Sequence, residues 1–465
     1  MKLKLKNVGK IKEADIELSG LTLIAGPNDS GKSTVGKVLF ALMKSIANYP
    51  ALFEQIQRDK LYKEYLNPLH LELRTIERDE LMQSQQVPLF IEAKISPQSK
   101  RKLLRVIHDL YRARDNILDN EEISDLLDVV RKNINGFRNK EYIEYLVSDA
   151  MKFLNKDKTS KDKIQLISNR IFQDVFENNI NNSLYRKDVA NIIFETDGVQ
   201  VLSLISNNDS ISCTSFNEGM TVFSDATLIE NPFLLENNFS IYSDYRDRFV
   251  PVVMRPVDSK IIDTSTDLVE KERSAAKKLH KETYHEDLLK EFEEVFHSAQ
   301  FKYSSSDGRL KYKVDSKAKE LEISNIASGC KSFGLLYILL KTGVITKNGI
   351  LILDEPENHL HPEWQIKYAE IICKMVKKGF YVLLTSHSPY MIQALRTYSE
   401  KEEIFDKKVN FYFASKDKNG KNYSIIENVR NEDGIFNDSR IFQSLYSPIE
   451  ILDDIYSEIN HKCKG

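Results

Sequence analysis

This chain is poor in cysteine, and its four cysteines follow no pairing pattern. Cys213, Cys330, Cys373 and Cys463 include no C-x-x-C spacing, which argues against a disulfide framework or a zinc site and fits a reducing cytoplasm. No secretory signal opens the sequence, and no apolar run approaches the roughly 20 residues that cross a bilayer. We therefore expect a cytoplasmic protein without a membrane partner.

The chain also lacks a dominant charge. Its 66 lysines and arginines nearly balance 69 acidic residues, for a formal net charge of -3, so there is no global attraction to nucleic acid, although local basic faces remain open. No internal repeat or low-complexity segment interrupts the 465 residues. A chain of this length is expected to fold as two or three lobes.

The hydrophobic pattern changes along the chain and predicts five segments. Strand-like alternation surrounds a continuous apolar run at the start, helical spacing follows, and strands and helices alternate near the end, as in a parallel α/β sheet. The predicted segments are the N-terminal part of an α/β head at 1–95, a helical insertion at 100–185, a β-rich part of the head at 190–260, a helical segment at 261–305 and the C-terminal part of the head at 309–465.

The segment "GPNDSGKST" has the spacing of a P-loop between an apolar strand and a helical run. Its glycines let backbone N–H groups cradle phosphate oxygens at a helix N-terminus. Lys32 is expected to reach the β- and γ-phosphates and Ser33 to ligate Mg²⁺. A chance glycine turn is the alternative, which the flanking strand and helix disfavour. The predicted nucleotide-binding residues are Gly26, Pro27, Asn28, Asp29, Ser30, Gly31, Lys32, Ser33 and Thr34.

A second motif, "ILILDEPE", places two carboxylates at the end of a buried strand. Ligands of open α/β sheets bind at that edge. Asp354 therefore suits the Mg²⁺ shell, and Glu355 suits polarisation of the water that attacks the γ-phosphate. Taken alone, such a pair is as often a helix cap or a solvated turn.

A third motif, "FYVLLTSHSPY", is another buried strand, and it ends next to His387. A single histidine is more often structural than catalytic. This one follows a strand expected to lie parallel to the carboxylate strand, where a γ-phosphate contact would arise. We therefore predict three catalytic residues, Lys32, Glu355 and His387.

Together these motifs resemble the ATP-binding-cassette ATPase head. Asn28 matches the P-loop style of the SMC and recombination ATPases, and the segments around residues 325–343, 350–372 and 383–395 look more specifically like OLD-type ATPases of bacterial anti-phage systems such as Septu, PARIS, Gabija and retrons. The likeness covers about 1–45 and 320–400. It implies an α/β fold, a P-loop NTPase head of the ABC type with a mostly parallel sheet and an antiparallel β lobe, interrupted by a helical insertion.

The resemblance identifies "ASGCK", 327–331, as the place of the ABC signature, which binds the γ-phosphate of the opposite subunit in that family. Ser328 and Gly329 match the signature, whereas Cys330 and Lys331 depart from it. Ser328, Gly329 and Lys331 are the predicted cross-subunit contacts, and an ordinary helix N-cap is the alternative.

The remaining sequence features give less information about function. His359 and His361 lie beside acids, but alternate residues after a strand point different ways, so we expect no metal there. The sole tryptophan, Trp364, suits core or interface packing. Residues 223–236 are our placement of the glutamine loop, and Arg255 is either an ATP or DNA contact or a solvated turn.

No nuclease is visible in the chain. It has no HNH pattern and no nucleophile elbow, and Asp453 and Asp454 stand on an expected final helix without the partners of a Toprim site. If cutting is part of the function, a separate protein is expected to do it.

Two functions fit these features. The first is an ATPase, with ATP and Mg²⁺, that forms a homodimer around ATP, or a higher oligomer, and controls a separate effector in antiviral defence, expected to be a nuclease of HNH or Toprim type. The alternative is a DNA repair or recombination ATPase of the SMC-like class that clamps DNA, so nucleic acid is a further candidate partner. A transporter motor is a third, weaker reading.

Overall fold

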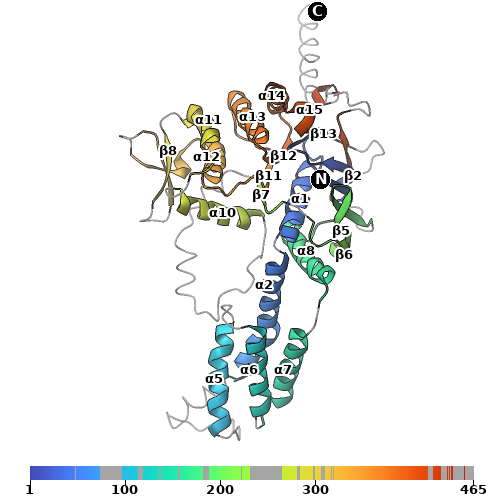
Figure 1. The fold of residues 1–465 in the computed structure, drawn as a ribbon, viewed down its shortest axis with the longest axis vertical. Coiled ribbons are helices and arrows are strands. Elements are labelled where there is room, and N and C mark those ends of the chain that lie inside the picture. Colours follow the sequence, from blue (N-terminus) through green and yellow to red (C-terminus); the bar gives the residue numbers. More distant parts are fainter. Residues whose placement is uncertain are drawn as a thin grey trace, which may run out of the picture. The chain divides into compact units, whose positions relative to one another are not determined.

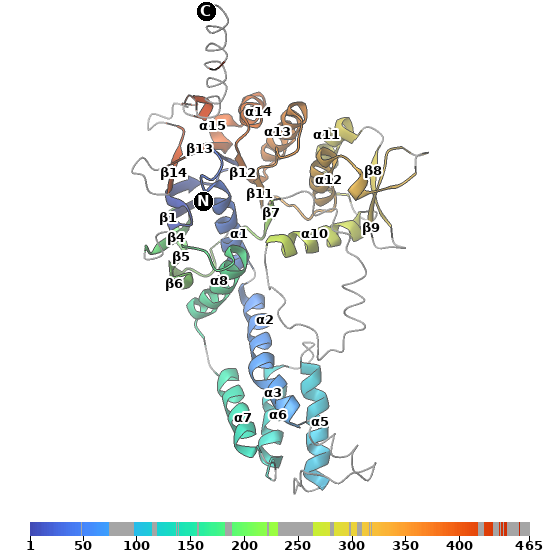
Figure 2. The same cartoon turned by 180° about the vertical axis from the view of Figure 1, so that it is seen from behind.

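The computed structural model describes residues 1–47, 49–73, 97–113, 119–135, 137, 139–155, 158–181, 188–220, 223–230, 264–279, 283–296, 299–304, 309–315, 317, 319–416, 423–430, 437, 439, 441–443 and 455. The chain divides into two compact units. The first unit comprises Met1–Asn48, Ile164–Arg255 and Lys260–Gly465, and the second comprises Tyr49–Lys163 and Pro256–Ser259. Figures 1 and 2 show the elements of both units from opposite sides.

The first unit is built on a sheet to which the described residues contribute 11 strands. The strand order is β6-β5-β4-β1-β2-β14-β13-β3-β12-β11-β7 (Figure 1). The strands from β13 to β7 in this order run parallel to one another, whereas β6, β5, β4, β1 and β2 are antiparallel. The predicted α/β fold with an antiparallel β lobe is therefore confirmed. The strands are β1 (Lys2–Val8), β2 (Ile11–Glu17), β3 (Leu21–Ala25), β4 (Ala190–Thr196), β5 (Val199–Asn207), β6 (Ser210–Phe216), β7 (Ala226–Ile229), β11 (Ile350–Asp354), β12 (Tyr381–Ser386), β13 (Val409–Lys416) and β14 (Ser424–Asn428).

The parallel strands are continuous apolar runs, as expected for strands covered on both faces. Every residue of β3 is buried, and in β11 only the final aspartate is partly exposed. The register pairs Ala25 with Ser386 and Asp354 with Thr385. The carboxyl ends of β3, β12 and β11 therefore lie along one edge of the sheet, where ligands of such sheets bind.

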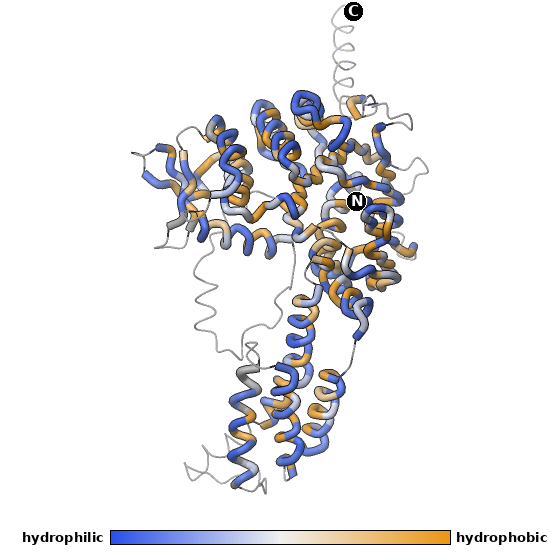
Figure 3. Tube along the Cα trace, viewed as in Figure 1, coloured by the Kyte–Doolittle hydropathy of each residue, from blue (hydrophilic) through white to orange (hydrophobic). Residues whose placement is uncertain are grey.

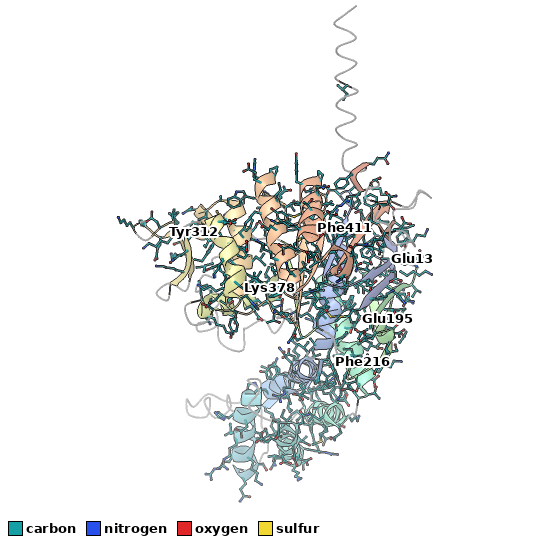
Figure 4. All side chains as sticks on the ribbon, turned by 45° about the horizontal axis from the view of Figure 1, so that its top comes forward. Glu13, Glu195, Phe216, Tyr312, Lys378 and Phe411 are labelled. Atoms are coloured by element: carbon teal, nitrogen blue, oxygen red, sulfur yellow. The ribbon has the colours of Figure 1, made fainter. Side chains whose placement is uncertain are left out.

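The antiparallel strands alternate between buried and more exposed residues instead. In β4 the pattern is strict, and Glu195 on its outer side accepts a hydrogen bond from Lys4 of β1 at 2.8 Å (Glu195 is labelled in Figure 4). The turns of this lobe need left-handed backbone. Asp197 has a φ of 50° before Gly198, and Asn208 and Asp209 have φ values of 48° and 63°. Asp-Gly and Asn-Asp pairs tolerate that conformation, which explains the tight hairpins.

Helices flank the parallel strands in the first unit. Helix α1 packs on β7, β11 and β12. Gly36 allows this approach, because a Cβ there would lie 3.0 Å from Cγ2 of Ile352. The helices of this part are α1 (Lys32–Ala47), α13 (Pro362–Lys377), α14 (Pro389–Lys401) and α15 (Phe405–Lys408).

A smaller layer surrounds helix α12 (Ser328–Lys341) in the same unit. It contains α10 (Thr264–Lys278), α11 (Glu286–Phe296) and a sheet of β8 (Gln300–Ser304), β9 (Arg309–Lys313) and β10 (Leu321–Glu322). Aromatic rings fill its interior. Phe301 contacts Tyr312 with ring centroids 5.1 Å apart, and a Cβ on Gly334 would collide with Phe301 (Tyr312 is labelled in Figure 4). The predicted helical segment at 261–305 thus contains two helices and a strand in its described residues.

The second unit is a set of amphipathic helices with its own apolar core (Figure 3). It starts at Tyr49, earlier than the predicted insertion at 100–185, because Leu61 and Leu69 of its first helices are buried with residues of the later ones. It ends at Lys163, inside α8 (Ser160–Phe176). Its other helices are α2 (Tyr49–Leu61), η1 (Tyr62–Leu66), α3 (Asn67–Leu73), α5 (Pro97–Ala113), α6 (Asn120–Asn133) and α7 (Lys140–Leu154). Across both units, the described helices include none whose length and apolarity would let it cross a membrane.

A buried charge cluster ties α1 to β7 and α10 in the first unit. Lys44 lies 2.6 Å from Asp267 and also pairs with Asp225, while Lys271 lies 2.6 Å from Asp225 and 3.1 Å from Asp267. The next residue, Glu272, is only 4% exposed, and burial raises its pKa to about 8.

The replacement Glu272→Gln is expected to stabilise the protein at alkaline pH. The folded state keeps the carboxyl proton up to about pH 8, whereas the unfolded chain loses it near 4.5. The free energy of unfolding therefore falls as pH rises through this window, and removing the carboxyl recovers on the order of a few kcal/mol at pH 9. Urea unfolding at pH 5 and pH 9 measures this, with exposed Glu270→Gln on the same helix as the control. An equal gain at both pH values would contradict the prediction.

Candidate active site

The turn between β3 and α1 admits only glycine at two positions. A Cβ at Gly26 would lie 2.7 Å from the carbonyl oxygen of Ala414, and Gly31 has a φ of 80°. Gly26 also donates its N–H to the carbonyl of Ser386 at 3.3 Å, which fixes the turn to the end of β12. Ser30 is 1% exposed, and within the described part of the chain its hydroxyl has no hydrogen-bond partner. The turn thus holds a buried polar atom that a phosphate oxygen would satisfy.

Lys32 begins α1 and is directed into this turn. Its side chain is 3% exposed, and Nζ donates to the carbonyl of Pro27 at 2.9 Å. The same Nζ lies 3.4 Å from Oε1 of Glu355. A buried ammonium group needs anionic partners. Glu355 is one such partner, and the position of Lys32 lets it bind a second anion in the turn.

Asp354 and Ser33 face each other across the same edge. Burial raises the pKa of Asp354, and the charges of Glu230 and Glu355 add to that effect, while hydrogen bonds from Thr385 and Ser33 oppose it. Glu230 follows β7 directly, inside the predicted glutamine-loop segment at 223–236, whose later residues lie outside the described ones. Carboxylate and hydroxyl oxygens are the donors that Mg²⁺ prefers, and the ion would relieve the repulsion between these carboxylates, so the residues fit the metal.

Glu355 is held in an unusual backbone conformation, with a φ of 48°. Its N–H donates to the carbonyl of Thr385 at 3.2 Å, and its Oε1 lies 3.4 Å from Nδ1 of His387. His387 and then Lys32 hold the pKa of Glu355 at about 2, against the effect of burial, and Glu355 in turn raises the pKa of His387. Lys32, Glu355 and His387 thus converge from three separate segments.

A pocket of about 510 Å³ opens beside these residues, within the size range of small-molecule sites. Five of the residues that line it come from parts of the chain that carry no nucleotide motif, and the sequence analysis did not identify them. Lys10, in the turn between β1 and β2, forms an ion pair with Asp29 at the pocket wall. The pocket is lined by Gly9, Lys10, Asp29, Ser30, Gly31, Lys32, Ser33, Thr34, Phe176, Asn179, Asn181 and Glu355.

The predicted signature residues do not line this pocket. Ser328 starts α12, and Gly329 lies against Trp364, whose Cε3 a Cβ would approach to 2.8 Å. Lys331 is 4% exposed and donates to the carbonyl of Ser324 at 3.3 Å. Its expected contact with the phosphate of a second copy stays a prediction.

The two histidines after β11 lie at turns of the backbone. His361 is the N-cap of α13 and accepts the N–H of Glu363 at 3.4 Å, and His359 has a φ of 65°. Among the residues that the model describes, no cluster of three or more histidine, cysteine, aspartate or glutamate side chains is arranged to hold a metal ion. Arg255, Asp453 and Asp454 lie outside those residues.

Sequence and structure comparisons show which known proteins this chain is similar to. A family model described as an AAA ATPase domain matches residues 1–392. The Septu protein PtuA of Bacillus thuringiensis is 41% identical over 46 residues, which cover 10% of this chain and 11% of that relative. The chain thus aligns with about a tenth of the length of that curated relative.

Solved structures with a similar arrangement include heads of SMC proteins. The SMC head domain from Thermotoga maritima matches with a TM-score of 0.37 and 12% identity, over 92% of this chain and 98% of that chain. An SMC head bound to the C-winged helix domain of ScpA matches with a TM-score of 0.39 and 13% identity, over 93% and 98%.

Proposed function

This chain belongs to the AAA ATPase domain family, and we propose from that membership and from its site that it hydrolyses ATP with Mg²⁺ as a homodimer and controls a separate effector in antiviral defence. The observation that carries the proposal is the convergence of Lys32, Glu355 and His387 at one sheet edge beside the glycine turn.

Each residue has a role in the proposed reaction. The N–H groups of 26–34 and Lys32 bind the β- and γ-phosphates, and Ser33 with Asp354 would hold Mg²⁺. The metal would supply charge neutralisation of the triphosphate. Glu355 orients the attacking water and accepts its proton, and His387 contacts the γ-phosphate.

Two observations support the proposed dimer. Ser328 and Gly329 are outside the pocket of their own chain, and the N–H groups at the start of α12 lack a side-chain cap. A helix start of this kind binds an anion. We assign that anion to the γ-phosphate held by a second copy, so that two active sites form at the interface.

The defence role rests on narrower support. The 46-residue likeness to Septu protein PtuA and the OLD-like motifs favour it over DNA repair. The helical unit at Tyr49–Lys163 is the proposed dock for an effector, which we expect to be a nuclease in the same cytoplasm. Co-expression with the products of the adjacent genes tests this part, because a stable complex of stoichiometric composition is required.

Mixing two inactive variants tests the shared site. Lys32→Ala removes the phosphate site in the P-loop of its own chain. Ser328→Arg blocks the start of α12, which the chain is proposed to contribute to the site of its partner. In a mixed dimer one of the two sites combines the intact P-loop of one chain with the intact helix start of the other. About half of the dimers are mixed, so roughly a quarter of the wild-type ATPase rate is expected to return. Each variant alone is the control, and no recovery on mixing would refute the shared site.

A further inference from the structure

Glu357 is a third carboxylate near the active site, and none of the roles above uses it. It lies three residues after Asp354 and is 4% exposed. One oxygen, Oε1, accepts three hydrogen bonds from the loop after β12. The donors are the hydroxyl of Ser386 at 2.7 Å, the N–H of His387 at 2.8 Å and the N–H of Ser388 at 3.2 Å. All three donors belong to the segment that carries the catalytic imidazole.

A buried carboxylate in this position lowers the free energy of unfolding unless its hydrogen bonds compensate. Removing an ionised group from water costs several kcal/mol before hydrogen bonds offset it. Burial raises the pKa of Glu357, and its second oxygen, Oε2, has no hydrogen-bond partner among the described residues. A stable core would not need this arrangement, because an apolar residue of similar size packs there at lower cost.

A second link holds the same loop from the other side. The Ser388 hydroxyl donates to Oε1 of Gln365 at 2.5 Å, and Nε2 of Gln365 donates to the carbonyl of Leu360 at 3.0 Å. Ser388 also caps α14, since its hydroxyl accepts the N–H of Met391. The loop is therefore fastened to the segment between Glu357 and Gln365 rather than to its own strand alone.

We propose that Glu357 is a positioning residue for ATP hydrolysis. By accepting the N–H groups of the loop, it holds the imidazole of His387 within 3.4 Å of Glu355, in reach of a γ-phosphate. Without it, the loop loses three hydrogen bonds and keeps its links to Gly26 and Gln365, neither of which involves His387, so the imidazole loses its fixed distance to Glu355. This inference rests on the proposed function, since it concerns the same reaction.

The first measurement separates kcat from ATP affinity. The hydrogen bonds and the ion pair given for the Glu357 carboxylate all go to the loop after β12 and none goes to the P-loop. Glu357→Ala is therefore expected to lower kcat about 10- to 100-fold and leave the Kd for ATP within twofold. Glu357→Gln keeps an acceptor oxygen in place and is expected to recover most of the rate. This second variant also serves if Glu357→Ala does not fold. A Glu357→Gln enzyme as slow as His387→Ala, with an unchanged unfolding temperature, would overturn the proposal.

A double-mutant cycle shows whether Glu357 acts through His387. If it does, adding Glu357→Ala to His387→Ala lowers kcat by less than twofold further. A full additional loss would mean that Glu357 acts elsewhere, and the proposal would be wrong. Failure of the ATPase assignment looks different, because the wild type would then hydrolyse no ATP and Glu355→Gln would change nothing.

Discussion

Glu355→Gln is expected to lower kcat for ATP hydrolysis by about 10²- to 10⁴-fold while ATP stays bound. Glutamine has the same shape but accepts no proton, so the attacking water loses its base. The substitution also removes a negative charge 3.4 Å from Lys32 and from His387, both of which then face the triphosphate without competition. Affinity for ATP should therefore rise.

The trapped state gives a second readout of the same variant. With ATP and Mg²⁺, Glu355→Gln should elute as a stable dimer in size-exclusion chromatography with light scattering, whereas the wild type returns to monomer as ATP is consumed. Exposed Glu363→Gln, on the first turn of α13, is the matched control. Hydrolysis at the wild-type rate by Glu355→Gln would exclude Glu355 as the base.

Lys32→Ala is expected to weaken ATP binding by 100-fold or more. The lysine is almost fully buried at the turn, and charge-assisted hydrogen bonds from such a group are worth about 1.5 to 3 kcal/mol each. Its loss also leaves the Glu355 carboxylate paired with His387 alone, so its negative charge repels the γ-phosphate more strongly. ATP-dependent dimerisation should vanish with binding.

Isothermal titration calorimetry and the ATP-induced rise in unfolding temperature measure this loss independently of turnover. Lys32→Met keeps the apolar stem and separates the charge from packing, and Lys277→Ala, exposed on α10, is the neutral control. If Lys32→Ala bound ATP with wild-type affinity, the phosphate site would have to lie elsewhere.

The parts of the site that sequence predicts are those encoded in one short segment. The glycine turn and the aspartate that ends β11 need only their neighbours, since a strand end and a helix start suffice to place them. Residues contributed from a distance escaped prediction. Asn179 and Asn181 line the pocket although about 150 residues separate them from the P-loop, and no local pattern marks them.

The fold shows the same division. Apolar runs predicted the parallel strands well, because burial on both faces leaves a continuous signature. The start of the helical unit at Tyr49 was not predicted, because only the packing of α2 with later helices assigns it to that unit. The hydrogen bond from Lys331 to the carbonyl of Ser324 was not predicted either, because it depends on the packing of the segment before α12.

Phe176, the last residue of α8, lines the pocket together with Asn179 and Asn181. One wall of the nucleotide pocket therefore comes from a segment that carries no nucleotide motif, so the shape of the site depends on residues far from the P-loop in sequence.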